Sequence, residues 1–353
     1  MVRRRLPTHQ RAAASPGLLA ARLLQGAGGS ALSPVSLSLL LGLSRGEDEE
    51  RRAVGAWVAT AATATCAGPL LGGLLTSALG WRAVFGTLAL LAAVTAGCAL
   101  ILLPGRPARY GRPERRLDGV GIALCTAAAT TALIALTAPE AGAAAVSVTL
   151  LAVLLHRARH RADSVLDSGL IGNPSTRTAL FVLLVLFCAN SMFTFLTYFA
   201  LTRAHGLSPL GAALVGLPAV TPAVFTGRWA ARRTRGPGDG PPLMRAGLLC
   251  VAAGLLTSGL GRSQAAPLWL VGVSCAMVGC GLGLANGSAM ATVTRDRSRR
   301  AASRATATAT TFAMLGGATG PALAGALASH MPLLIGAMAL AAATLTRQAN
   351  PDR

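Results

Sequence analysis

The sequence predicts an all-α protein, a polytopic bundle of membrane-spanning helices. Of its 353 residues, 53% are hydrophobic and only 12% are charged, so the chain is more apolar than an ordinary soluble domain. The apolar residues gather in blocks of about 20, the length that crosses the hydrocarbon core of a bilayer. Between these blocks, arginine-rich and arginine-poor connections alternate, as in proteins that cross a membrane repeatedly.

About eleven segments are long and apolar enough to be predicted spans, and the fifth is among the shortest. Sequence patterns locate helices better than helix ends, so the limits are approximate. The predicted spans are 17–43, 52–79, 82–103, 118–137, 141–156, 178–201, 208–227, 243–261, 267–292, 304–327 and 331–346.

The arginines between the spans predict an orientation. The arginine-rich connections are 44–52, 104–117, 156–177, 228–245 and 293–304. The other connections hold Arg82, Arg203 and Arg262. By the positive-inside rule, we expect the arginine-rich set and the C-terminus to be cytoplasmic. The N-terminus then falls outside, although residues 1–11 are basic. Either the first span inserts against its charge bias, or the chain lacks an odd number of helices at its start.

Composition also excludes several classes of function. The net charge of +20 suggests nucleic acid, but the basic residues lie in short clusters between apolar blocks, so we expect no nucleic-acid partner. The 7 cysteines form no CxxC pair, and no metal site is predicted. The sequence has no phosphate-binding glycine loop, catalytic triad or HExxH motif. We therefore expect no cofactor and no enzymatic activity.

A glycine- and proline-rich stretch occurs twice. The first copy, residues 67–74, reads AGPLLGGL, and the second contains Gly320 and Pro321. Proline removes a backbone donor and bends a helix, while glycine lets a neighbouring helix approach closely. Two repeats of parallel sense suggest the two-half architecture of secondary transporters.

At these residues the chain resembles the major facilitator superfamily, and more narrowly its fourteen-helix drug:proton antiporters of the QacA/EmrB type. The stretch from Arg22 to Gly28, RLLQGAG, is similar to the RxxQG motif of the family's fourth helix. The fifth-helix antiporter motif ends in GPxxGG, and Ala64 replaces one of its glycines here. The residues that match it are Gly55, Gly68, Pro69, Gly72 and Gly73.

The resemblance implies a division of the chain and one departure from the family. Because the first span resembles the family's fourth, three helices are expected to be absent, together with their acidic motifs. A second-half echo of the lost loop is present at 227–233, where Ala231 replaces an acid. The expected parts are a basic segment 1–16 unlike the family, three helices of the N-terminal half at 17–103, a linker with two extra helices at 104–177, a six-helix C-terminal half at 178–347, and a tail at 348–353.

The resemblance also implies roles for several residues. Arg22 lies inside a span, where an ionisable side chain is costly, and the family's matching arginine is implicated in proton coupling. Alternatively, Arg22 extends to the near interface. Gln25, one turn away, could hydrogen-bond a substrate, Arg22 or a neighbouring helix. The motif glycines either support alternating access or pack statically.

Polar side chains inside the later spans could line a substrate cavity, or they could join helices through hydrogen bonds. They are Asn190, Thr194, Tyr198 and Asn286. No carboxylate lies within a span interior, although a proton-coupled exporter of cations would use one. The histidines His156 and His205 lie in loops and are assigned no chemistry.

The sequence therefore predicts a multi-pass protein of the plasma or inner membrane that exports small, amphipathic, drug-like compounds. We expect proton-coupled antiport by alternating access, with the bilayer, a small-molecule substrate and protons as partners, and a monomeric state. Because three helices are expected to be absent, the chain could be a truncated form that is inactive alone. The alternative is a non-transporting, degenerate membrane protein or a partial subunit that needs a partner fragment. The nucleotide sequence upstream of Met1 discriminates between them, since three further apolar spans there would favour a transporter.

Overall fold

The computed structural model describes residues 16–43, 46–102, 119–137, 141–160, 172–236, 238–260, 267–295 and 299–326. Within these ranges the regular structure is helical, and no strand occurs. The all-α prediction is confirmed there. The expected span 331–346, the tail 348–353 and nearly all of the basic segment 1–16 lie outside the described residues.

Every predicted span up to 304–327 overlaps a helix. The helices are α2 (Pro16–Leu43), α3 (Glu47–Leu79), α4 (Trp81–Leu102), α5 (Gly119–Thr137), α6 (Ala141–His160), α8 (Pro174–Arg203), α9 (Pro209–Gly216), the short 3-10 helix η1 (Leu217–Ala219), α10 (Val220–Arg233), α11 (Gly240–Leu260), α12 (Leu268–Thr294) and α13 (Arg299–Ala326).

Five helical segments are long and apolar enough to cross a membrane. They are Trp81–Leu102, Pro174–Arg203, Pro209–Arg233, Gly240–Ser258 and Leu268–Thr294. Hydropathy and length of this kind are typical of transmembrane helices. The described part of the chain therefore has the character of a multi-pass membrane protein.

The contacts divide the chain into two units. One consists of Met1–Ala64 with Pro104–Tyr110, and the other of Thr65–Leu103 with Gly111–Arg353. The first unit contains α2 and the beginning of α3. The second contains the end of α3 and all later helices.

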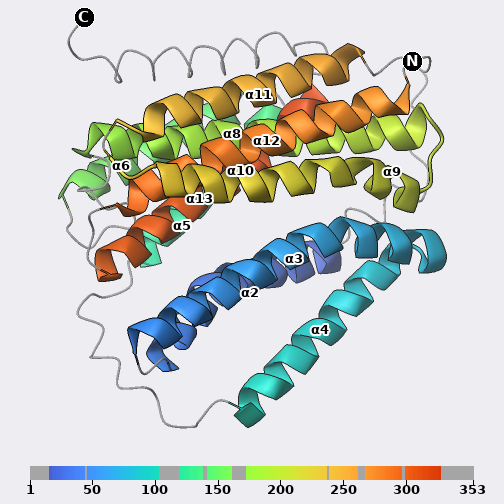
Figure 1. Cartoon of the computed structure of the whole chain (residues 1–353). Coiled ribbons are helices and arrows are strands. Elements are labelled where there is room, and N and C mark those ends of the chain that lie inside the picture. The colour runs from blue at the N-terminus through green and yellow to red at the C-terminus, as the bar shows by residue number, and fades with distance from the viewer. Residues whose placement is uncertain are drawn as a thin grey trace, which may run out of the picture. The chain divides into compact units, whose positions relative to one another are not determined.

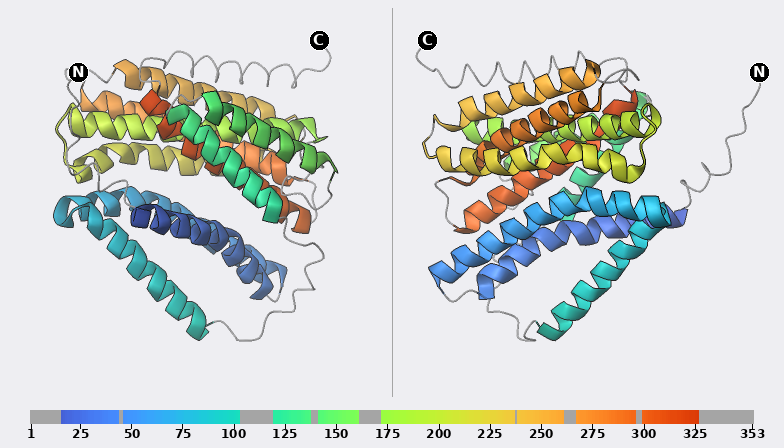
Figure 2. Two further views of the ribbon diagram at one scale, coloured as in Figure 1. Left: turned by 180° about the vertical axis from the view of Figure 1, so that it is seen from behind. Right: turned by 45° about the vertical axis from the view of Figure 1, so that its right-hand side comes forward.

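The core of the second unit lies between α8, α11, α12 and α13. Figures 1 and 2 show α8, α11 and α12 running side by side. The largest fully buried side chains come from α8 and α11, among them Leu183, Leu186, Met192, Leu248 and Leu255. Because lipid is as apolar as these side chains, close packing rather than water exclusion holds such helices together.

Local sequence explains where two of these helices begin. Asn173 caps α8, because its side-chain oxygen accepts hydrogen bonds from the Ser175 and Thr176 amides at 3.0 and 3.4 Å. Ser208 caps α9 and accepts from the Gly211 amide at 3.1 Å. A proline follows each cap at the first helical position, where its missing donor costs nothing.

Two glycines make the sharp connections that end helices. Gly80, between α3 and α4, has φ of 83°, and Gly206, between α8 and α9, has φ of 64°. Residues with a Cβ rarely adopt this left-handed backbone conformation, so glycine suits both positions. These turns allow the next helix to start within a few residues.

The predicted span 208–227 differs most from the structure. It is divided into α9, η1 and α10, and helix continues to Arg233. The division falls at Leu217 and Pro218, where proline removes a backbone donor. By contrast, Pro69 and Pro321 lie inside the continuous helices α3 and α13.

Candidate functional site

Close helix contacts in the second unit are built on glycines of α12. Gly279, Gly283 and Gly287 follow at i, i+4 spacing and therefore share one face. A Cβ at Gly279 would overlap the backbone of Ala219, and one at Gly287 would overlap the backbone of Gly227. Only glycine lets α10 and α12 approach this closely, as in other small-residue membrane contacts.

The second copy of the glycine-proline motif makes a contact of the same kind. A Cβ on Gly316 would overlap the carbonyl of Leu184 on α8, and one on Gly320 would overlap the carbonyl of Cys188. Pro321 follows directly on α13 and is half-buried. This copy of the motif therefore lies where α13 crosses α8.

The first copy lies on α3, and one of its glycines also meets a neighbour. A Cβ on Gly73 would lie 2.9 Å from the carbonyl oxygen of Pro209. One turn later, the Ser77 hydroxyl accepts a hydrogen bond from the Leu210 amide at 3.2 Å. These residues all belong to the second unit, so the end of α3 contacts the start of α9 there.

The other motif glycines on α3 have different surroundings. Among the described atoms, nothing lies within 4 Å of a Cβ built on Gly68 or Gly72. Pro69 is exposed. Gly55 lies nearer the start of the same helix, in the first unit. Among Gly68, Gly72 and Gly73, the last is therefore the one in close contact with a neighbouring helix of the described structure. Gly72 can serve as the control position when the contact at Gly73 is tested by substitution.

Arg22 and Gln25 are paired on α2 in the first unit. The Arg22 Nη1 donates a hydrogen bond to Gln25 Oε1 at 3.0 Å. Both side chains are exposed within the described structure. The i, i+3 spacing places them on one helix face.

The predicted cavity residues lie on two helices of the second unit. Asn190, Thr194 and Tyr198 follow at i, i+4 spacing on α8, and the Thr194 hydroxyl donates to the Asn190 carbonyl at 2.9 Å. Thr194 and Tyr198 are exposed. On α12, the Asn286 Oδ1 is buried without a hydrogen-bond partner in the described part of the chain. A buried acceptor without a partner is costly and marks a site where a polar group would bind favourably.

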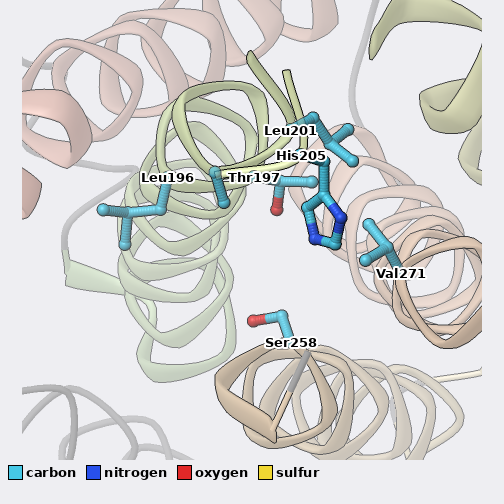
Figure 3. A pocket seen from close by; sticks show the side chains of 7 residues that line it. Leu196, Thr197, Leu201, His205, Ser258 and Val271 are labelled. Carbon is cyan, nitrogen blue, oxygen red and sulfur yellow. The ribbon is translucent and has the colours of Figure 1, made fainter. Parts of the chain in front are cut away.

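A histidine that the sequence analysis left without a role lines a small cavity (Figure 3). His205 follows α8, and its Nε2 is buried with no hydrogen-bond partner among the described residues. The cavity measures about 10 Å³ and is lined by Thr197, Leu201, Ser258 and Val271, among others. Ser258 comes from α11 and Val271 from α12, so three helices enclose the imidazole. The residue was missed because sequence alone does not show which loop histidine folds back into a bundle.

Carboxylates are scarce in the described residues. They occur only in the first turn of α3 and at Asp239, between α10 and α11. No group of three His, Cys, Asp or Glu side chains in the described ranges is placed to hold a metal ion. In the described residues, the first unit therefore offers an arginine–glutamine pair, and the second offers glycine contacts, amide and hydroxyl groups, and one half-buried imidazole.

The sequence of residues 9–321 matches the profile of the Major Facilitator Superfamily. The chain belongs to the major facilitator superfamily. The match covers most of the described residues and both glycine-proline motifs, so the family resemblance stated from those motifs is confirmed at superfamily level. Members of this family are transporters and not enzymes, which agrees with the absence of catalytic motifs from the sequence.

Named relatives within this superfamily are resistance and efflux proteins. The chain is 29% identical to "Methylenomycin A resistance protein" of Streptomyces coelicolor, over 76% of this chain and 57% of that protein. It is 32% identical to "Drug efflux pump JefA" of Mycobacterium tuberculosis, over 74% of this chain and 53% of the relative. It is 29% identical to "Multidrug efflux pump LfrA" of Mycolicibacterium smegmatis, over 68% of this chain. The chain spans about half the length of these relatives.

Proposed function

We propose that this chain is a membrane efflux transporter that exports small, amphipathic, drug-like compounds by alternating access. The observation that carries the proposal is the family match over residues 9–321, which includes both glycine-proline motifs. Relatives named as drug efflux pumps support the substrate class. The family forms multi-pass bundles in the cell membrane, and the five apolar helices fit that location.

We base the branch, energy source, orientation and oligomeric state that we propose on the antiporters of this family. We assign the chain to the fourteen-helix branch, with proton antiport as the energy source, a cytoplasmic C-terminus and a monomeric state. Arg22 and Gln25 are assigned to proton coupling or substrate contact, supported by their pairing on α2. Asn190, Thr194, Tyr198 and Asn286 are assigned to the substrate path, supported by exposed or unpartnered polar atoms.

Proton coupling needs a group that gains and loses a proton. We propose that His205 is such a group in the second unit. Histidine changes charge within the physiological pH range, and its Nε2 here faces a cavity bordered by the Thr197 and Ser258 side chains. Within the described residues, the other charged or titratable side chains on these three helices are Arg177, Cys188, Tyr198 and Arg203 on α8, Arg245 and Cys250 on α11, and Cys275 and Cys280 on α12. Protonation would place a positive charge beside two hydroxyl acceptors and change how α8, α11 and α12 pack.

Efflux itself is tested with a fluorescent cationic dye in cells that express the chain. We expect lower dye accumulation than in cells with an empty vector, and full accumulation once a protonophore collapses the gradient. Equal accumulation in both cell lines, with the protein present in the membrane, would contradict the proposed function.

The Gly73 contact gives a prediction with an internal control. Gly73→Val should reduce dye efflux severalfold, because its Cβ would meet the Pro209 and Leu210 backbone, which cannot move aside like a side chain. Gly72→Val adds the same side chain at a position with nothing within 4 Å. Its efflux should stay close to wild type. Equal loss in both variants would show that the Gly73 contact has no special part in transport.

His205→Gln tests the proposed protonation site. The glutamine keeps a polar side chain but removes the titratable nitrogen. We expect efflux by the variant to respond little to an imposed proton gradient, whereas efflux by the wild type should increase with the gradient. An equal response to the gradient in the two proteins would exclude His205 from proton coupling while leaving the efflux proposal intact.

A further inference from the structure

An arginine-lined hollow opens at the end of α10, in the segment 227–233 that the sequence analysis identified as an echo of a family loop. Its volume is about 710 Å³. The lining includes Arg232, Arg233 and Arg235, with Trp229 and Leu243 beside them. All three arginines are exposed. Cationic groups therefore surround a space that also has apolar walls.

The loop that carries this hollow is fixed in place. The Asp239 Oδ2 accepts hydrogen bonds from the Gly236 and Arg235 amides at 2.6 and 3.1 Å. These bonds, the Gly236 one foremost, hold the pKa of Asp239 below its ordinary value. Arg295, at the end of α12, donates to the Gly236 carbonyl. Asp239, the one carboxylate that lines the hollow, thus hydrogen-bonds to the loop backbone. The three arginines beside it give the lining a net positive charge.

The face of α10 that leads to the hollow is apolar and aromatic. Phe225 and Trp229 follow at i, i+4 spacing, are 70% and 49% exposed, and lie opposite the buried Ala230 face that packs on α12. Arg233 lies one turn further on, with its guanidinium carbon 5.6 Å from the Trp229 ring centroid. Two exposed aromatic side chains thus lie along α10, which belongs to the apolar segment Pro209–Arg233 that is long enough to cross a membrane, and they lead to cationic groups.

We propose that this hollow binds the headgroup of an anionic phospholipid, with Arg232, Arg233 and Arg235 around the phosphate and an acyl chain along Phe225 and Trp229. Arginine suits phosphate because its planar fork of donors matches the oxygens. Tryptophan near the ends of membrane helices packs at the level of lipid headgroups. Basic pockets between membrane helices bind such headgroups elsewhere, and this end of α10 is the one that arginine placement predicts to be cytoplasmic. A free acidic peptide or inorganic phosphate would use the guanidinium groups but not the two aromatic side chains. The inference does not depend on whether the chain transports anything.

The test is native mass spectrometry of the purified, delipidated full chain in neutral detergent, titrated with phosphatidylglycerol or phosphatidylcholine. We expect phosphatidylglycerol to bind at lower concentration than phosphatidylcholine. The triple variant Arg232→Gln, Arg233→Gln, Arg235→Gln should weaken phosphatidylglycerol binding by about a hundredfold, since each arginine near anionic lipid contributes about fivefold. The matched control is Arg177→Gln, Arg203→Gln, Arg228→Gln, which removes equal charge from exposed arginines that do not line the hollow. This control should bind like wild type.

Three outcomes would overturn the proposal. One is equal weakening in the control triple variant, which would indicate general charge attraction. Another is unchanged phosphatidylglycerol binding in the hollow variant. The third is full displacement of phosphatidylglycerol by inorganic phosphate or an acidic peptide at comparable concentration, which would assign the hollow to an anion without an acyl chain. Thermal unfolding of both triple variants without lipid should match wild type, so that loss of binding is not loss of fold.

Discussion

Arg22→Ala is expected to abolish efflux while the protein still inserts into the membrane. The substitution removes the cation and its hydrogen bond to Gln25 on α2. Arg22 lies in the predicted span 17–43, where an arginine would be costly, and this favours a functional role. We expect dye export to fall by about a hundredfold, the scale on which positioned proton-transfer groups act. The measurement is the initial rate of dye export in energised cells, normalised to the amount of protein in the membrane.

Arg177→Ala is the control for this prediction. Arg177 is an exposed arginine in the first turn of α8, where its side chain lies near the end of a span. Its replacement removes the same charge, and export should stay near wild type. Undiminished export in Arg22→Ala would remove Arg22 from the mechanism and leave the alternative that its side chain only extends to the interface.

Gly283→Leu is expected to destabilise the second unit strongly. A Cβ at Gly283 would overlap the Ala223 carbonyl and the Thr226 side chain on α10. The clash involves backbone, so α10 and α12 would have to separate along their length. Overpacking of this kind costs about 1–3 kcal/mol and more where backbone must move. We expect a clear fall in the midpoint of thermal unfolding and in the yield of monodisperse protein.

Gly272→Leu on the same helix adds an equal volume where nothing lies within 4 Å of the built Cβ. Its unfolding midpoint should stay near wild type, because substitutions without new contacts usually change stability by less than about 0.5 kcal/mol. If the two variants melted alike, the close α10–α12 contact would not be a determinant of the fold.

The helices could be predicted from sequence because each apolar block is long and bounded by clear signals. The predicted span 178–201 became α8 at Pro174–Arg203, extended at its start because Asn173 caps it and Pro174 suits the first position. The predicted span 208–227 ended before the observed end of α10 at Arg233. Hydropathy did not predict this end, because Arg232 and Arg233 are polar yet continue the helix. Arginine is a good helix former, so helix and apolar span end at different residues.

The site was harder to predict, because a motif does not show which of its residues meets a neighbour. Gly68, Gly72 and Gly73 match the antiporter pattern equally well, but only Gly73 meets a neighbouring helix within the described structure. The α12 glycines have the small-residue spacing of membrane contacts, and that signal could have identified them. The position of the His205 imidazole beside the cavity depends on how the residues after α8 fold against α11 and α12, and no local pattern encodes it.

We propose that a proton gradient drives export of a small amphipathic compound through this chain. The most direct measurement uses the purified protein in sealed liposomes with a fluorescent cationic dye and an imposed pH gradient. We expect dye movement against the direction of proton flow, no net movement without the gradient, and no movement in liposomes that contain Arg22→Ala. Dye flux of equal size with and without the gradient would contradict proton-coupled antiport.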